Sequence, residues 1–152
     1  MARTTPIHSG YTILNGTGAG SNGGRIEVWA EYSVTEQSVE GNSSRVKAYF
    51  YAALRAGQSS STQYSSGLSS SFRVDGTAGS GVENGAYDFT SPANLHLLGS
   101  FEGEIAHDSD GSKRIAIEGS FSTRSTYISG GSVSGTVTLP AIARATTPTV
   151  QP

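Results

Sequence analysis

Apolar and polar side chains alternate along much of this chain, which is the pattern of a β-strand with one buried face. One such segment covers residues 26–34 and a second covers residues 46–54. If Val39–Gly41 form a three-residue loop, Ile26 faces Leu54 and the apolar positions of the two segments match. A shift of one residue would turn every apolar side chain to the other face, so we expect a hairpin in this register.

A second stretch pairs with itself in the same way around a turn at Ser109–Gly111. With Gly111 in the left-handed conformation that such a loop needs, Ile105 faces Ile115 and Phe101 faces Gly119. One side of this ribbon is apolar, and its large rings lie beside glycines. We therefore expect residues 99–121 to form a hairpin whose apolar side packs against the rest of the domain.

The remaining pattern completes an all-β domain. Three weaker strands and a last strand are expected at Tyr11–Leu14, Ser70–Asp75, Ala86–Phe89 and Ser132–Leu139. Segments rich in Gly and Ser separate the strands, at Asn15–Gly24, Gly57–Gly67 and Gly76–Gly85. No segment has a convincing helical pattern. About eight strands with regular turns predict an antiparallel, jelly-roll-like β-sandwich.

The ends of the chain lack this periodicity. We expect an N-terminal arm at 1–9, the β-sandwich at 10–142, and an extended C-terminal tail or linker at 143–152 that contains two prolines. The length of 152 residues is that of one domain. The start of the chain has no apolar signal-peptide core, and the longest apolar run, 48–54, is too short to span a bilayer.

Composition narrows the function classes. Only 14% of the residues are charged and the formal net charge is -2, so no basic surface recruits nucleic acid. The absence of cysteine excludes disulfides and thiolate chemistry. A composition rich in Gly, Ser and Thr is common in proteins exposed outside cells, yet the chain has no secretion signal. A virion protein, made in the host cytoplasm and released by lysis, reconciles these two observations.

The outer face of the first hairpin is the best candidate for a binding surface. In the expected register Trp29 lies opposite Tyr51 and Glu31 lies opposite Tyr49, with Lys47 further along the same face. Aromatic rings beside charged groups can stack on a sugar ring and bond to its hydroxyls. The same residues are equally suited to burial under a loop or against a second subunit. Packing is the commoner outcome, and both interpretations remain open.

Other apparent sites have simpler explanations. His107–Gly111 superficially resembles a calcium loop, but its glycine is placed for a tight turn and not for an EF-hand. Gly18–Gly23 matches G-x-G-x-x-G but leads into a strand, so no helix N-terminus would meet a phosphate. The three histidines show no metal-ligand spacing, and no nucleophile elbow occurs. We expect no enzyme activity, no cofactor and no metal site.

Two C-terminal motifs carry a family resemblance. Residues 106–121 resemble a motif of tailed-bacteriophage structural proteins in which a His-Asn-x-Asp-Gly-Thr-Lys turn leads into a strand ending Gly/Ala-Ser-Phe. Residues 132–148 resemble the closing signature of the same family, Gly-Thr-Val-x-Leu-Pro-x-Ile-Pro-Arg-Ala-Ser/Thr. This chain has Asp108 for the usual Asn and Ala143 where proline is common, and both changes preserve the turn and the extended ending.

The resemblance implies a minor structural, tail or host-adhesion protein of phages that infect Gram-positive bacteria. It carries over no catalytic residue. The expected function is a non-enzymatic virion component, favoured as a tail or tail-tip accessory protein. The expected partners are other virion proteins and further copies of the chain, without nucleic acid or membrane. The alternatives are a host-adhesion module that binds cell-wall polysaccharide and a capsid decoration protein.

Overall fold

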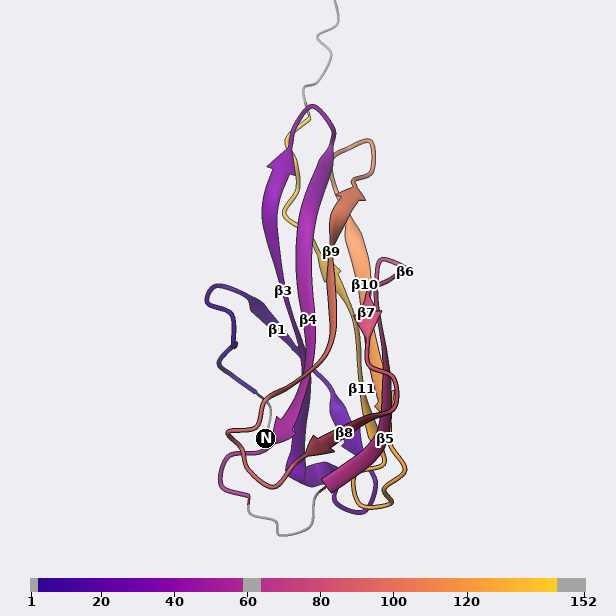
Figure 1. Cartoon of the computed structure of the whole chain (residues 1–152). Coiled ribbons are helices and arrows are strands. Elements are labelled where there is room, and N and C mark those ends of the chain that lie inside the picture. The colour runs from indigo at the N-terminus through magenta and orange to yellow at the C-terminus, as the bar shows by residue number, and fades with distance from the viewer. Residues whose placement is uncertain (1–2, 59–63, 145–152) are drawn as a thin grey trace, which may run out of the picture.

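A computed structural model describes residues 3–58 and 64–144 of the chain (Figure 1). Within these residues there is no α-helix, only a 3-10 turn at Gly23–Arg25. No helix in this part of the chain is long and apolar enough to cross a membrane. The strands are β1 (Thr12–Asn15), β2 (Thr17–Ala19), β3 (Ile26–Ser38), β4 (Ser43–Leu54), β5 (Tyr64–Val74), β6 (Thr77–Ala78), β7 (Ser80–Gly81), β8 (Gly85–Asp88), β9 (His96–Ala106), β10 (Arg114–Ser122) and β11 (Gly130–Thr138).

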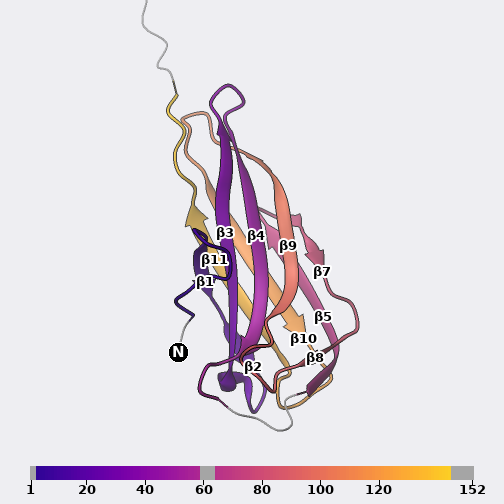
Figure 2. The same ribbon diagram turned by 60° about the vertical axis from the view of Figure 1, so that its left-hand side comes forward.

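The strands form two antiparallel sheets that pack face to face. Sheet A has the order β1-β3-β4-β9-β7, and sheet B has the order β2-β11-β10-β5-β6, with β8 paired to β5. Figures 1 and 2 show the two layers from two sides. The predicted all-β sandwich is confirmed. Short strands also form within the predicted Gly- and Ser-rich connections, as β2, β6 and β7.

The hairpin of β3 and β4 has the predicted register. Ile26 faces Leu54, and the expected pairing continues as far as Val34. The predicted three-residue loop is wrong: the loop has four residues, because Ser38 pairs with Ser43. A bulge directly after Val34 absorbs the extra residue. The inner pairing is therefore kept although the tip of the hairpin differs.

The second predicted hairpin does not form, because β9 and β10 lie in different sheets. β9 pairs with β4, whereas β10 pairs with β5 and β11. The turn itself is present, since Asp108 N donates to Ser112 O at 2.8 Å and Gly111 has a φ of 90°. Alternation shows which face of a strand is buried. It does not show whether the partner lies beside the strand or across the core.

The pairing of rings with glycines has the same explanation. Phe50 on β4 lies beside Gly99 in sheet A, and it faces Gly119 across the core. A Cβ placed on Gly119 would lie 3.0 Å from the Phe50 ring. The Phe50 ring also contacts Phe72 and Phe121, at centroid distances of 5.9 and 6.3 Å. The glycines therefore let aromatic rings from both sheets fill the main core.

Candidate functional site

The predicted site on the outer face of β3 and β4 is covered by the N-terminal arm. The Arg3 guanidinium lies over the Trp29 ring, 4.5 Å from its centroid, and Arg3 also forms an ion pair with Glu27 at 3.3 Å. The Trp29 ring stacks on Tyr51 at 5.4 Å, and Ile7 of the arm packs against them. Trp29 is 0% exposed. The arm and the sheet thus form a second, smaller core outside sheet A.

Glu31 holds the arm on this face. Its carboxylate accepts hydrogen bonds from the backbone N–H groups of Ile7 and His8, at 2.7 and 2.9 Å, and from Trp29 Nε1 at 2.8 Å. Glu31 itself is 0% exposed. A carboxylate that is buried needs such donors, and hydrogen bonds to it are stronger than bonds between neutral groups. The contacts of Glu31 therefore couple the arm to β3.

His8 extends these contacts to the tyrosines of β4. Its ring stacks on Tyr49 at a centroid distance of 4.1 Å, and its Nε2 forms a hydrogen bond with the Tyr51 hydroxyl at 2.8 Å. Burial raises the pKa of Tyr51, and the nearby Glu31 carboxylate raises it further. Tyr11 lies 5.1 Å from the His8 ring, and its pKa is also raised, first by burial and then by Tyr49.

The structure brings four of the five predicted residues into contact. Trp29, Glu31 and Tyr51 are buried, as the packing interpretation expects for a face covered by a loop. Tyr49 is half-buried and forms an aromatic patch with His8 and Tyr11, which we call the tyrosine patch. The sequence reasoning missed the arm residues, since the arm has no alternation that would predict a contact with the sheet.

The fifth predicted residue, Lys47, belongs to a charged cluster beside the tyrosine patch. Its Nζ lies 3.7 Å from Glu102, and Arg45 bonds to the same carboxylate at 2.8 Å. The hydrogen bond from Arg45 lowers the pKa of Glu102, and Lys47 lowers it further. These side chains remain accessible to solvent. The tyrosine patch and the charged cluster are thus the two parts of the predicted site that the arm does not bury.

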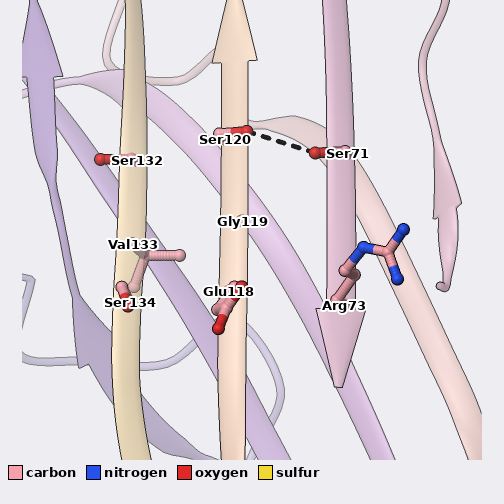
Figure 3. Close-up of a pocket in the computed structure, with 8 residues that line it drawn as sticks. All are labelled: Ser71, Arg73, Glu118, Gly119, Ser120, Ser132, Val133 and Ser134. Carbon is pink, nitrogen blue, oxygen red and sulfur yellow. Dashed lines mark hydrogen bonds between the residues drawn. The ribbon is translucent and has the colours of Figure 1, made fainter. Parts of the chain in front are cut away.

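The outer face of sheet B has a different character. Small hydroxyl side chains from neighbouring strands line a shallow pocket of about 260 Å³ (Figure 3). Ser120 bonds to Ser71 at 3.2 Å, and Ser132 is paired with Ser120 on the other side. Glu118 is paired with Arg73, but Figure 3 shows the Arg73 guanidinium turned away, and its Nη1 donates to Gly76 O at 3.1 Å.

We call this surface the hydroxyl face. One row of exposed hydroxyl side chains crosses four adjacent strands, at Thr17, Ser132, Ser120 and Ser71. The residues that line this pocket include no aromatic side chain, so the pocket offers no ring for stacking. It presents hydrogen-bonding groups on a shallow surface.

The two C-terminal motifs meet at the end of the sandwich near the β3–β4 loop. The Gly111 carbonyl accepts hydrogen bonds from His107 Nδ1 at 2.8 Å and from Ile142 N at 2.9 Å. His107 Nε2 forms a second bond, to Ser44 Oγ at 2.6 Å. His107 and Ile142 are both buried. We call His107, Gly111 and Ile142 the C-terminal clamp.

Further contacts hold the segment that passes through the clamp. Gln37 Nε2 donates to Pro140 O at 2.8 Å, and Arg144 Nη1 donates to Val39 O. Figure 1 shows this yellow segment running beside the tip of β3 and β4. The predicted extended ending is described as far as residue 144, and the rest of the predicted tail lies outside the described residues.

The turn interpretation of the aspartate-rich loop is confirmed. Asp110 Oδ1 accepts hydrogen bonds from Ser112 Oγ at 2.6 Å and from Ser112 N at 2.9 Å, and these bonds lower the pKa of Asp110. Across residues 3–58 and 64–144, no group of three His, Cys, Asp or Glu side chains is arranged to hold a metal ion.

Comparisons with protein-family models, with curated proteins and with solved structures find no match to this chain.

Proposed function

We propose that the chain is a non-enzymatic structural component of a bacteriophage virion, favoured as a tail or tail-tip accessory protein that acts through protein–protein contacts. The C-terminal clamp is the observation that carries this proposal. The two motifs that resemble phage structural proteins pair with each other along β10 and β11, and they meet again beyond these strands at the Gly111 carbonyl. These contacts hold the segment after β11 at the end of the sandwich.

The clamp suits a protein that works by contact. It aligns the segment 140–144 with the tip of the β3–β4 hairpin, and hydrogen bonds from Gln37 and Arg144 join the two. An end that is held by such contacts can present neighbouring loops to another subunit with a smaller loss of conformational entropy on binding.

Mass spectrometry of purified particles tests this proposal. We expect peptides of the chain at a constant ratio to the major virion proteins through successive density-gradient steps. Failure to detect the chain in particles that contain all the other virion proteins would contradict the proposal. Imaging of particles with labelled antibodies against the chain then distinguishes the tail from the capsid. Label at the tail supports the favoured role, and label over the capsid supports the decoration alternative.

The tyrosine patch favours a second candidate, a host-adhesion module that binds cell-wall polysaccharide. Tyr49 and Tyr11 present partly accessible rings, and Lys47 and Glu102 lie on the same face. Rings can stack on a sugar while charged groups bond to its hydroxyls. Trp29 and Glu31 are buried and can support such a site only through their contacts with Tyr51 and His8.

Binding of the purified chain to host cell walls tests this candidate. If the patch stacks on sugar, we expect Tyr49→Ala to lower the binding affinity about tenfold or more, because it removes one stacking contact. Tyr127→Ala is the matched control, because Tyr127 is 54% exposed and lies in the loop between β10 and β11. Equal binding by the two variants would contradict a glycan site at the tyrosine patch.

A further inference from the structure

One edge of sheet B is open over part of its length. β2 pairs with β11 only at residues 130–132, and Gly16 then lies against Val133. From Ser134 to Thr138, β11 pairs with β10 on one side, and the described part of the chain supplies no backbone partner on the other side. Figure 2 shows β11 and β1 together at this side of the sandwich.

The open edge lacks the features that usually prevent strands from pairing between molecules. Residues 134–138 read Ser-Gly-Thr-Val-Thr, without charge, proline or bulge. By contrast, the free part of β3 carries a bulge after Val34 and the charged Glu36. The strands that end the two sheets, β1, β2, β6 and β7, have four, three, two and two residues. The part of β9 beyond its pairing with β7 carries the charged Glu102 and Glu104. β11 is therefore the edge best suited to accept another strand.

The ends of the open segment determine which register a second copy can adopt. β2 and Gly16 close it before residue 134. After Thr138, the N–H of Leu139 bonds to Lys113 O, and Pro140 has no N–H to donate. An antiparallel partner of the same sequence is thus centred on Thr136, which then faces its own copy. Gly135 faces Val137, and Ser134 faces Thr138.

These pairings are complementary on both faces of the sheet. Ser134, Thr136 and Thr138 are exposed, so hydroxyls would meet hydroxyls on the outer face. On the inner face the Leu14 side chain of β1 fills the space over Gly135, so the partner's Val137, which lies opposite Gly135, would add to an apolar contact at this edge.

We propose that two copies of this chain associate through antiparallel pairing of their β11 edges about a two-fold axis at Thr136. The pairing would join the two B sheets into one continuous sheet and make the two hydroxyl faces contiguous. The contact is short, so the expected dimer is weak in isolation and gains strength from additional contacts in a larger assembly. It concerns the purified chain and does not depend on the virion role.

A charge swap at the two-fold axis tests this dimer. Thr136→Lys and Thr136→Glu each place like charges directly opposite each other, and each is expected to raise the dimer Kd about tenfold or more. Mixing the two variants pairs opposite charges and restores a dimer, which sedimentation measurements at up to about 1 mM protein detect. Ser71→Lys is the matched control, since Ser71 is an exposed residue of the same face on β5. It is expected to leave dimerisation unchanged.

A disulfide tests the register. The chain contains no cysteine, so Thr136→Cys introduces a single thiol. Residues opposite each other in antiparallel strands have Cα atoms about 4.5–5.5 Å apart, within the range that a disulfide spans. Mild oxidation should link most of this variant into dimers, while Ser120→Cys on the neighbouring strand should remain monomeric.

Three results would overturn the proposal. One is a wild-type chain that stays monomeric over the whole concentration range. Another is a dimer that Thr136→Lys does not weaken. The last is equal disulfide formation by the Thr136 and Ser120 variants, since this would show random collision and not a fixed register. If Thr136→Lys failed to fold, which circular dichroism would show, the Thr136→Cys and Ser120→Cys pair alone would decide.

Discussion

The two outer faces of the sandwich share the alternation of their strands and differ in what covers them. On sheet A, Trp29 and Glu31 are outward positions of β3, yet both are 0% exposed because the N-terminal arm lies over them. On sheet B, Ser120 and Ser132 are equally outward positions and are exposed. The same backbone geometry therefore supports a second small core on one side and a bare hydroxyl face on the other.

This difference shows what an outward aromatic residue requires. A large aromatic ring on the outer face of a sheet is more stable when another segment of the chain shields it from water. Here that segment is the N-terminal arm, whose backbone bonds to the buried carboxylate of Glu31. Serine side chains lose little when they stay in water, so the hydroxyl face needs no cover. The comparison predicts that substitutions on the covered face are costly and that matched substitutions on the bare face are not.

Trp29→Ala should have the largest effect. Removing a buried tryptophan leaves a cavity between the arm and the sheet and is expected to lower the free energy of unfolding by about 3–5 kcal/mol. Ser120→Ala on the hydroxyl face should change it by less than about 0.5 kcal/mol. Urea unfolding followed by circular dichroism measures both values. Similar values for the two variants would mean that the arm does not form a second core.

Glu31→Gln should have the next largest effect. Glutamine offers one acceptor oxygen in place of two and places an NH₂ group among three hydrogen-bond donors. We therefore expect the substitution to lower the free energy of unfolding by about 2–3 kcal/mol. Trp29 is the single tryptophan of the chain and therefore reports on the arm. Its emission should shift to longer wavelength and its quenching by acrylamide should increase. Glu118→Gln on the hydroxyl face is the control and should change neither property.

Tyr51→Phe should lower the free energy of unfolding by about 0.5–1.5 kcal/mol, because it removes the hydroxyl that bonds to His8. It should also change the alkaline pH dependence. Burial raises the pKa of Tyr51 in the folded state. The contribution of Tyr51 to the free energy of unfolding is therefore fully present below its unfolded-state pKa of about 10, and it is lost as pH rises through the folded-state pKa.

The variant lacks this ionisation, so its unfolding free energy should fall less steeply above about pH 10 than that of the wild type. Unfolding curves at a series of alkaline pH values measure the two slopes. Identical slopes would contradict the burial of the Tyr51 hydroxyl under the arm.

Glu102→Gln tests the uncovered part of sheet A and should have the smallest effect. The hydrogen bond from Arg45 lowers the pKa of Glu102 in the folded state. Its contribution to stability is therefore present above the ordinary pKa of about 4.3 and is lost as pH falls through the folded-state value. The variant should show a shallower loss of stability in acid. Because the group is exposed, added salt should reduce the difference in unfolding free energy between variant and wild type. A large difference that does not change with salt would contradict this prediction.

Local patterns predicted the parts of the fold that depend on neighbours in the sequence. The register of β3 and β4 follows from alternation and a short loop, and its error was confined to the tip, where a bulge compensates for the longer loop. The turn at Gly111 follows from turn chemistry in the same way. The candidate face around Trp29 was also placed by this register, because residues opposite each other in a hairpin must share a face.

Contacts between distant segments were not predictable from these patterns. Residues 99–105 and 115–121 match each other equally well as neighbours in one sheet and as partners across a core, and only the packing of two whole sheets selects the second arrangement. The arm has no periodicity, so its position over Trp29 depends on the Glu31 carboxylate and on the rings of β4.

By itself, the sequence determined the all-β class, the approximate positions of β3, β4, β9, β10 and β11, the main hairpin and the turn at Gly111. Each of these depends on side-chain alternation or on backbone conformations that few residues adopt. The tertiary structure decided which sheet each strand joins, which outward face is covered, and that the two C-terminal motifs meet in the clamp. These outcomes depend on burial and on hydrogen-bond partners that are far away in the chain. Alternation specifies a buried face without specifying what buries it.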